Sequence, residues 1–210
     1  MLSNIKNLSL TKKLAYKIVF FIFCLIPFFS GLDSIPPLDR DESRFVQSTY
    51  QMIETNDYIN IKFLDEIRAK KPIGIYWAQS IFANIFGEDK ISSYRYVSTL
   101  GALITILILW KFSQILFGQK ASLFVVSASM ISLLFIFESH VAKTDTLLLS
   151  LITLQQFLLL KIILNKEKSI LFDLIMPISM WLVLGIGFLI KGPISLLSLI
   201  HISEPTRRYE

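Results

Sequence analysis

Long runs of apolar residues, separated by short polar or charged segments, dominate the pattern of this 210-residue sequence. A run of about 20 apolar residues can cross the roughly 30 Å hydrocarbon core of a bilayer. Because lipid offers no partners for backbone polar groups, such runs must form helices. The pattern predicts five membrane spans, at about Leu14–Leu32, Val97–Phe117, Ala121–Phe137, Thr146–Leu164 and Leu171–Ile190.

A sixth apolar stretch starts at Ile194 and stops at Ile202, so we expect the chain to end inside a sixth span. The polar residues 201–210 do not continue this helix, and we interpret them as a non-native tail, with a short native tail as the alternative. The predicted fold class is an all-α membrane protein, a polytopic helical bundle in which residues 1–200 are one amino-terminal part of a transmembrane domain.

Lysines near the ends of the spans predict the orientation in the membrane, because basic residues favour the cytoplasmic side. If the spans alternate in direction, the lysine-bearing regions fall on one face: Lys6, Lys12, Lys13 and Lys17, then Lys111 and Lys120, then Lys161, Lys166 and Lys168. The amino terminus is therefore predicted to be cytoplasmic. The loop of residues 31–96, the 138–145 connection and the 191–193 turn then lie on the opposite face, which is periplasmic for a bacterial inner membrane.

The first extracytoplasmic loop, residues 31–96, is predicted to carry two interfacial helices. Asp39 and Glu42 resemble a capping box, and apolar residues at helical spacing follow as far as Ile53. Asn56 and Asp57 end that helix, and alternation from Ile59 to Phe63 indicates a short extended segment. Pro72 suits the first position of a second helix.

Composition agrees with a membrane protein, since 53% of the residues are hydrophobic and only 18% are charged. The net charge of +5 comes from lysines at span ends, so it does not indicate nucleic-acid binding. The single cysteine, Cys24, cannot form a disulfide within the chain. No Cys, His or acidic residues stand at a spacing typical of metal ligands, so no metal site is predicted.

Two polar clusters of the first loop could carry chemistry. Asp41 and Glu42 could supply a carboxylate base to an acceptor hydroxyl, and Arg44 could hold an anion. The alternative is an interfacial loop whose charges pair with each other. Lys70 and Lys71 precede a helix amino terminus, which favours a bound phosphate. Attraction to anionic lipids, or plain solvation, is the alternative.

Two further clusters lie at the ends of later spans. Asp145 opens the fourth span, where it could cap the helix or, together with Lys143, face a polar cavity. Lys191 precedes Gly-Pro at the end of the fifth span. A lysine in hydrocarbon costs about 2.5–3.5 kcal/mol, so it should either snorkel to the surface or bind an anion.

The order and topology of these clusters resemble the polytopic glycosyltransferases of the GT-C fold, in the clan of protein O-mannosyltransferases and near the bacterial aminoarabinose lipid A transferase branch. The resemblance covers roughly Ile18–Leu199, which is the amino-terminal portion of a typical member. It implies a GT-C bundle that moves a sugar from a polyprenyl-phosphate carrier to an acceptor outside the cytoplasm, such as lipid A, another glycolipid or a protein.

The resemblance also implies roles for individual residues. Asp41, beside Glu42, matches the catalytic acid or base, and Asp145 matches a second cavity carboxylate. Lys71 matches the contact to the carrier phosphate, with Arg44 nearby and Lys70, Lys143 and Lys191 as further predicted substrate contacts. The aminoarabinose branch has a metal-binding glutamate where this chain has Lys70. The metal site is therefore not carried over, and a sister enzyme with another sugar or acceptor fits better.

Two other interpretations stay open at this stage. A transporter or flippase without catalysis would also place polar residues near the membrane, although transporter sites tend to lie near the midplane on broken helices. An inactive truncated fragment is the other alternative. The acids of this chain gather in the extracytoplasmic segments, which favours chemistry at the membrane surface.

Overall fold

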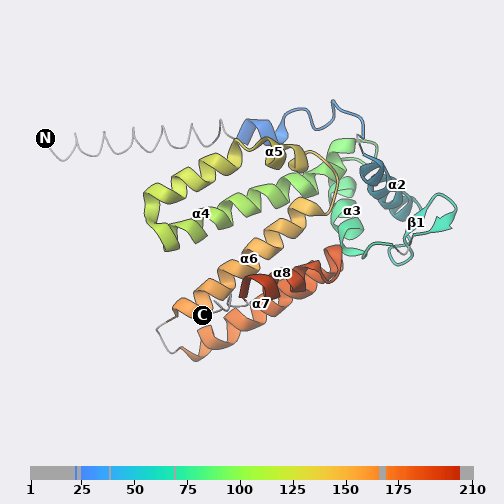
Figure 1. Ribbon diagram of the computed structural model, residues 1–210. Helices are drawn as coiled ribbons and strands as arrows, with labels where there is room; N and C mark the ends of the chain where they lie inside the picture. The colour runs from blue at the N-terminus through green and yellow to red at the C-terminus, as the bar shows by residue number, and fades with distance from the viewer. Residues whose placement is uncertain (1–21, 23–24, 38, 69, 166–168, 204–210) are drawn as a thin grey trace, which may run out of the picture.

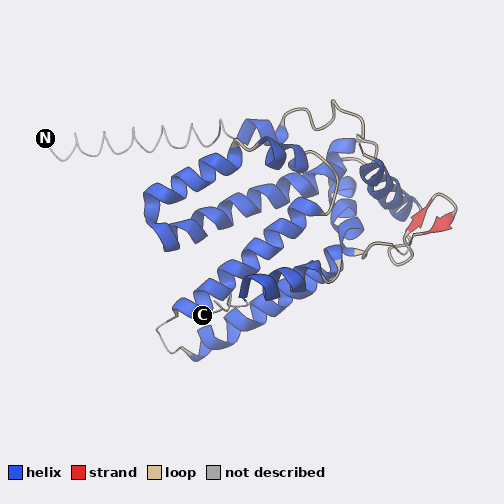
Figure 2. Ribbon diagram, in the orientation of Figure 1, coloured by secondary structure: helices blue, strands red, loops and turns tan. Residues whose placement is uncertain are grey.

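A computed structural model of the chain describes residue 22 and residues 25–37, 39–68, 70–165 and 169–203. The prediction of a helical membrane protein is confirmed, and the described part adds one small hairpin (Figures 1 and 2). Most of the predicted first span, residues 14–21 and 23–24, lies outside the described residues. The elements follow in the order α2 (Arg40–Glu54), β1 (Lys62–Phe63), β2 (Glu66–Ile67), α3 (Gly74–Phe86), α4 (Ile91–Met130), α5 (Leu133–Ser139), α6 (Asp145–Leu164), α7 (Ile170–Lys191) and α8 (Ile194–Ser203).

Three of the described helices are long and apolar enough to cross a membrane, namely α4, α6 and residues 172–191 of α7. Helix α4 is one 40-residue element that folds back on itself at Gly118, where φ is 82°. Glycine adopts this conformation without a side-chain penalty. The second and third predicted spans therefore form a hairpin around Gly118 (Figure 1).

The third predicted span, about Ala121–Phe137, is interrupted in the structure. Helix α4 ends at Met130, Ser132 takes an extended backbone, and the chain resumes as α5. Apolar residues flank the interruption on both sides, so hydropathy alone gives no sign of it. Helix α8 begins at Ile194 as expected and extends to Ser203, which makes the first three residues of the expected tail helical; residues 204–210 lie outside the described part.

The first loop folds as α2, the β1–β2 hairpin and α3. Asp39 is the N-cap of α2 and accepts a hydrogen bond from the Asp41 backbone N–H at 3.2 Å. In the hairpin turn, the Gln51 side chain accepts from the Leu64 N–H at 2.8 Å and donates to its carbonyl at 3.2 Å. These bonds hold Leu64 at a φ of 56° and fix the hairpin against α2.

Close backbone contacts join two of the spans to each other and a loop helix to a span. A Cβ added to Gly101 in α4 would lie 2.7 Å from the Leu147 nitrogen of α6, and one added to Gly74 in α3 would lie 2.7 Å from the Leu189 carbonyl oxygen of α7. Only glycine permits such an approach. A buried cluster around Phe45, Tyr76 and Val97 then packs α2 and α3 onto the start of α4.

Candidate functional site

The carboxylate of Glu42 lies inside the protein, in contact with two other segments. The Glu42 residue is 0% exposed. Its Oε1 accepts a hydrogen bond from Arg95 Nε at 2.8 Å and another from the Ala142 backbone N–H at 2.9 Å. Glu42 therefore joins α2 to α4 and to the connection between α5 and α6.

Arg95 extends this contact to the polypeptide that precedes α2. Its guanidinium donates to the carbonyls of Leu32 at 2.6 Å, Ile35 at 2.8 Å and Pro36 at 3.3 Å. A guanidinium has five fixed N–H donors and can hold several acceptors at once. We call Glu42 and Arg95 the buried clamp, since together they fix the amino terminus of α2.

Asp41, the residue before Glu42, lies in a different environment. Its side chain is 51% exposed and lies 3.7 Å from the guanidinium of Arg44. Burial raises the pKa of the Tyr76 hydroxyl, Arg68 opposes that rise, and the Asp41 charge adds to it. Asp41 is thus an accessible carboxylate whose charge acts on the Arg68–Tyr76 pair, in which Arg68 Nε donates to the Tyr76 hydroxyl at 3.3 Å.

The connection between α5 and α6 is held by hydroxyl and amide side chains from other helices. Ser98 donates to the Lys143 carbonyl at 3.2 Å, Thr99 to the Ser139 carbonyl at 3.1 Å, and Gln79 to the Ala142 carbonyl at 3.3 Å. These bonds place Lys143 at the amino terminus of α2.

Lys143 pairs with Asp39, not with Asp145. The hydrogen bond from Lys143 lowers the pKa of Asp39. Burial alone would lower the pKa of Lys143, but the bond to Asp39 and the charges of Asp39, Glu138 and Asp145 outweigh it, so the pKa is raised. Both groups are therefore charged at neutral pH.

Asp145 and Lys191 form an ion pair between the amino terminus of α6 and the carboxyl terminus of α7. Each charge is favourable where it stands, because the helix dipole stabilises an acid at an amino terminus and a base at a carboxyl terminus. Their side chains are 43% and 25% exposed. This pair lies beside α3, because Gly74 packs against Leu189, two residues before Lys191.

Lys70 and Lys71 differ from the other predicted basic contacts. Arg44, Lys143 and Lys191 each pair with an acid, whereas Lys70 and Lys71 have no ion pair within the described residues. They precede α3, whose N-cap residue Ile73 makes no side-chain capping bond. Unpaired lysines beside an uncapped helix amino terminus favour a bound anion.

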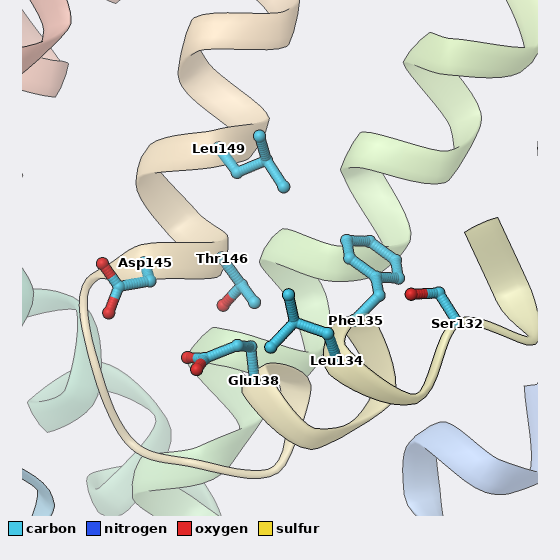
Figure 3. Close-up of a pocket in the computed structure, with 7 residues that line it drawn as sticks. All are labelled: Ser132, Leu134, Phe135, Glu138, Asp145, Thr146 and Leu149. Atoms are coloured by element: carbon cyan, nitrogen blue, oxygen red, sulfur yellow. The ribbon is translucent and has the colours of Figure 1, made fainter.

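A pocket of about 260 Å³ lies between α5 and α6 (Figure 3). One wall comes from the α5 side and the other from the first turns of α6. Its lining residues are Ser132, Leu134, Phe135, Glu138, Asp145, Thr146 and Leu149. Asp145 therefore borders both this pocket and the ion pair with Lys191.

The residues present do not fit the metal site of the aminoarabinose branch. The position of the family's glutamate is Lys70, which is exposed and carries an ammonium that cannot bind a cation. Across the described ranges, no three His, Cys, Asp or Glu side chains are grouped so that they could hold a metal ion.

Sequence reasoning missed Arg95 and Glu138. Arg95 lies one turn into a long apolar helix, and an arginine there requires an acidic partner. That signal could have indicated the clamp, but the partner could not be chosen from spacing alone. Glu138 stood in a predicted turn, and nothing in the sequence showed that it would face a pocket.

The long apolar helices define a polytopic membrane protein, with acids and bases gathered at the helix ends. The model of the family described as dolichyl-phosphate-mannose-protein mannosyltransferase matches residues 70–203, and the chain belongs to this family.

The chain is also similar to bacterial transferases that share one name. The chain is 28% identical to the undecaprenyl phosphate-alpha-4-amino-4-deoxy-L-arabinose arabinosyl transferase of Aeromonas hydrophila, over 88% of the chain and 32% of that protein. It is 29% identical to the same-named protein of Wigglesworthia glossinidia brevipalpis, over 88% of the chain and 33% of that protein. The chain thus spans about a third of the length of these relatives.

A solved structure shares the fold. The crystal structure of ArnT from Cupriavidus metallidurans bound to undecaprenyl phosphate superimposes with a TM-score of 0.80 at 19% identity, over 87% of this chain and 34% of that chain. The chain therefore has the fold of a GT-C membrane protein, as expected from its sequence.

Proposed function

We propose that this chain is part of a membrane glycosyltransferase that moves a sugar from a polyprenyl-phosphate carrier to an extracytoplasmic acceptor such as lipid A, another glycolipid or a protein. The observation that carries the proposal is the meeting of four helix ends. The amino terminus of α2 contacts Lys143, just before α6, and the amino terminus of α6 contacts the carboxyl terminus of α7. The end of α7 in turn packs against the amino terminus of α3, so accessible acids lie next to lysines along this series of contacts.

Lys71 is the proposed contact to the carrier phosphate, assisted by Lys70. Both lysines lack an ion-pair partner in the part of the chain that the structure describes, and α3 offers an uncapped amino terminus beside them. Arg44, Lys143 and Lys191 remain proposed contacts, each now paired with an acid that an incoming phosphate would have to replace. The ArnT structure was determined with undecaprenyl phosphate bound, which supports a carrier of this kind.

Asp41 is the proposed general base. Its carboxylate takes the proton of an acceptor hydroxyl while the acceptor oxygen bonds to the anomeric carbon of the sugar. The bond from that carbon to the phosphate oxygen breaks, and its electron pair leaves with the carrier phosphate. Fixed cations stabilise the charge that develops on the phosphate.

Glu42 and Asp145 support this step in different ways. Glu42 was predicted to be catalytic, but its burial and its bonds to Arg95 and Ala142 favour a positioning role, in which it sets the place of Asp41. Asp145 keeps an accessible carboxylate at the α6 terminus and orients Lys191.

The location proposed for this chemistry is the periplasmic face of a bacterial inner membrane. These helix ends lie opposite the bend of α4 at Gly118 and the carboxyl end of α6 (Figure 1). Lys111, Lys120 and Lys161 stand near those two places in the sequence. Basic residues favour the cytoplasmic side. The polar ends are then outside, where a flipped lipid-linked sugar and a lipid or protein acceptor meet.

The test uses the protein expressed from its complete gene. Asp41→Asn should lower sugar transfer at least 100-fold, the low end of the contribution of a general base. Asp65→Asn, in the exposed hairpin turn, is the matched control and should transfer at the wild-type rate. Transfer at the wild-type rate by a well-folded Asp41→Asn protein would remove Asp41 from the chemistry.

A transporter without catalysis predicts another result. It would move the lipid-linked sugar across the bilayer without forming a new glycosidic bond. Transport without any glycosylated product, in wild-type protein supplied with donor and acceptor, would decide for the transporter.

A further inference from the structure

The pocket between α5 and α6 contains polar atoms that have no partner. Glu138 Oε2 and Thr146 Oγ1 are both buried and make no hydrogen bond within the described residues. Thr146 is 2% exposed, and its hydroxyl points into the same space as the Glu138 carboxylate (Figure 3). Buried polar atoms nearly always have partners, so two such atoms that face one pocket favour a polar ligand there.

The chemistry of the walls defines what that ligand must offer. An ionised carboxylate only accepts hydrogen bonds, so Glu138 requires a hydrogen-bond donor, such as a hydroxyl or ammonium group. Phe135 and Leu149 supply apolar surface to the pocket. A volume of about 260 Å³ is just below the range of about 300–1,000 Å³ for drug-sized ligands. A single sugar ring, with hydrogen-bond donors on its edge and C–H groups on its face, has all three properties.

The position of the pocket connects it to the phosphate end of the site. Asp145 lines the pocket and pairs with Lys191, and Lys191 lies beside the amino terminus of α3 that follows Lys71. A phosphate held by the lysines would therefore present its attached sugar towards Asp145 and the pocket.

The geometry points to Glu138 and Thr146 as the residues that bind the sugar of the lipid-linked donor, through its hydroxyl or ammonium groups. This inference rests on the proposed function. It assigns the sugar and the phosphate to different residues, so the two can be tested separately.

The experiment compares binding of undecaprenyl phosphate alone with binding of the same carrier bearing 4-amino-4-deoxy-L-arabinose or mannose, in protein from the complete gene. Glu138→Gln should weaken binding of the sugar-linked carrier roughly tenfold or more, the value of a hydrogen bond to a charged group. Binding of the sugar-free carrier should not change. Glu54→Gln, at the exposed end of α2, is the matched control and should bind all carriers normally.

Thr146→Val separates ligand binding from folding. The substitution removes an unpaired hydroxyl and keeps the shape, so the free protein should melt at the same or a higher temperature. Binding of the sugar-linked carrier should still fall a few-fold. Thr153→Val, on the same helix and outside the pocket, should leave binding unchanged.

Four outcomes would count against these assignments. Equal loss for both carriers, or no loss in either variant, overturns the inference while leaving the proposed function intact. A wild-type protein that prefers no sugar-linked carrier over undecaprenyl phosphate also overturns the inference. A wild-type protein that neither binds undecaprenyl phosphate nor transfers sugar overturns the proposed function itself.

If Glu138→Gln weakens binding of the carrier with the amino sugar more than binding of the carrier with mannose, the group bound by Glu138 is an ammonium. Equal effects on the two carriers would identify hydroxyls. In the same assay Lys71→Gln should weaken binding of every carrier alike, because the phosphate is common to all of them.

Discussion

Asp41 and Glu42 are neighbours in the chain, yet their carboxylates lie in opposite environments. Glu42 is fully buried and bonded to Arg95 and Ala142, whereas the Asp41 side chain is 51% exposed beside Arg44. Consecutive residues at a helix start point in different directions, so one acid faces the protein and the other faces solvent. The difference shows how a membrane protein can fix a reactive carboxylate without burying it.

The same contrast extends to the other ion pairs. The buried clamp joins α2, α4 and the α5–α6 connection, and it is sealed from water. The pairs Asp39–Lys143 and Asp145–Lys191 are partly open, so their energies are small and a substrate can exchange for one partner. The buried clamp therefore stabilises the fold, and the open pairs remain available for binding.

The largest effect on stability should follow from removing one partner of the clamp. Arg95→Met leaves the Glu42 carboxylate buried without its guanidinium, and loss of one member of a buried pair costs about 3–5 kcal/mol. The free energy of unfolding in detergent measures this loss. Arg44→Met, which removes the partner of the exposed Asp41, should change stability by less than about 1 kcal/mol.

The double substitution Glu42→Leu with Arg95→Met gives a further check. Replacing both charges by apolar groups should recover much of the stability lost in the single variant. If Arg95→Met and Arg44→Met destabilise the protein equally, the distinction between buried and open pairs is wrong.

A smaller effect on stability is expected at the close contact between α3 and α7. A Cβ on Gly74 would lie 2.7 Å from the Leu189 carbonyl oxygen, and backbone atoms cannot move aside easily. Gly74→Ala should therefore destabilise by about 1–3 kcal/mol, as overpacking does, and should weaken undecaprenyl phosphate binding because α3 carries Lys71.

Gly185 offers a matched control on α7. A Cβ there has nothing within 4 Å, so Gly185→Ala should be neutral or should stabilise the helix by about 0.5–1 kcal/mol. Thermal unfolding of both variants measures the difference. Equal stability of the two alanine variants would mean that α3 does not depend on its close approach to α7.

The sequence was sufficient for features that depend on local pattern. Apolar runs predicted the long helices α4, α6 and α7, Asp39 predicted the start of α2, and Lys191-Gly-Pro predicted the end of α7, where Gly192 takes a φ of 70°. It was not sufficient for the partners of Glu42, because Arg95 and Ala142 are far away in the chain. Nor did hydropathy show the interruption at Ile131–Ser132, since both sides of that break are apolar.

The residues of the candidate site show the same division between local sequence signals and long-range contacts. Asp41, Lys71, Asp145 and Lys191 could be singled out because each stands at a helix end or beside a membrane span. The pairing of acids with bases could not be predicted, since Lys143 pairs with Asp39 of the first loop although Asp145 is only two residues away. Tertiary packing decides these pairings, and the sequence carries no periodic signal for them.

The smallest effect concerns the Asp39–Lys143 pair, which should make stability depend on pH at both extremes. The pKa of Asp39 is lowered from its ordinary value of 3.8 by Lys143, so its contribution is present above that value and is lost as pH falls through the lowered one. The pKa of Lys143 is raised from 10.5, so its contribution is present below 10.5 and is lost as pH rises further. The stability difference between the wild type and Asp39→Asn should therefore be constant from about pH 5 to pH 9 and should shrink on both sides.

Asp57→Asn provides the control for this last comparison. The pKa of Asp57 is lowered chiefly by the backbone N–H and side chain of Asn60, with no dominant lysine partner. Its removal should therefore change the acid side of the stability profile only. Unfolding measured across the pH range distinguishes the two variants. If the stability of Asp39→Asn still falls at alkaline pH as the wild type does, Glu138 and Asp145 raise the pKa of Lys143 without Asp39. The Asp39–Lys143 pair would then contribute no stability of its own.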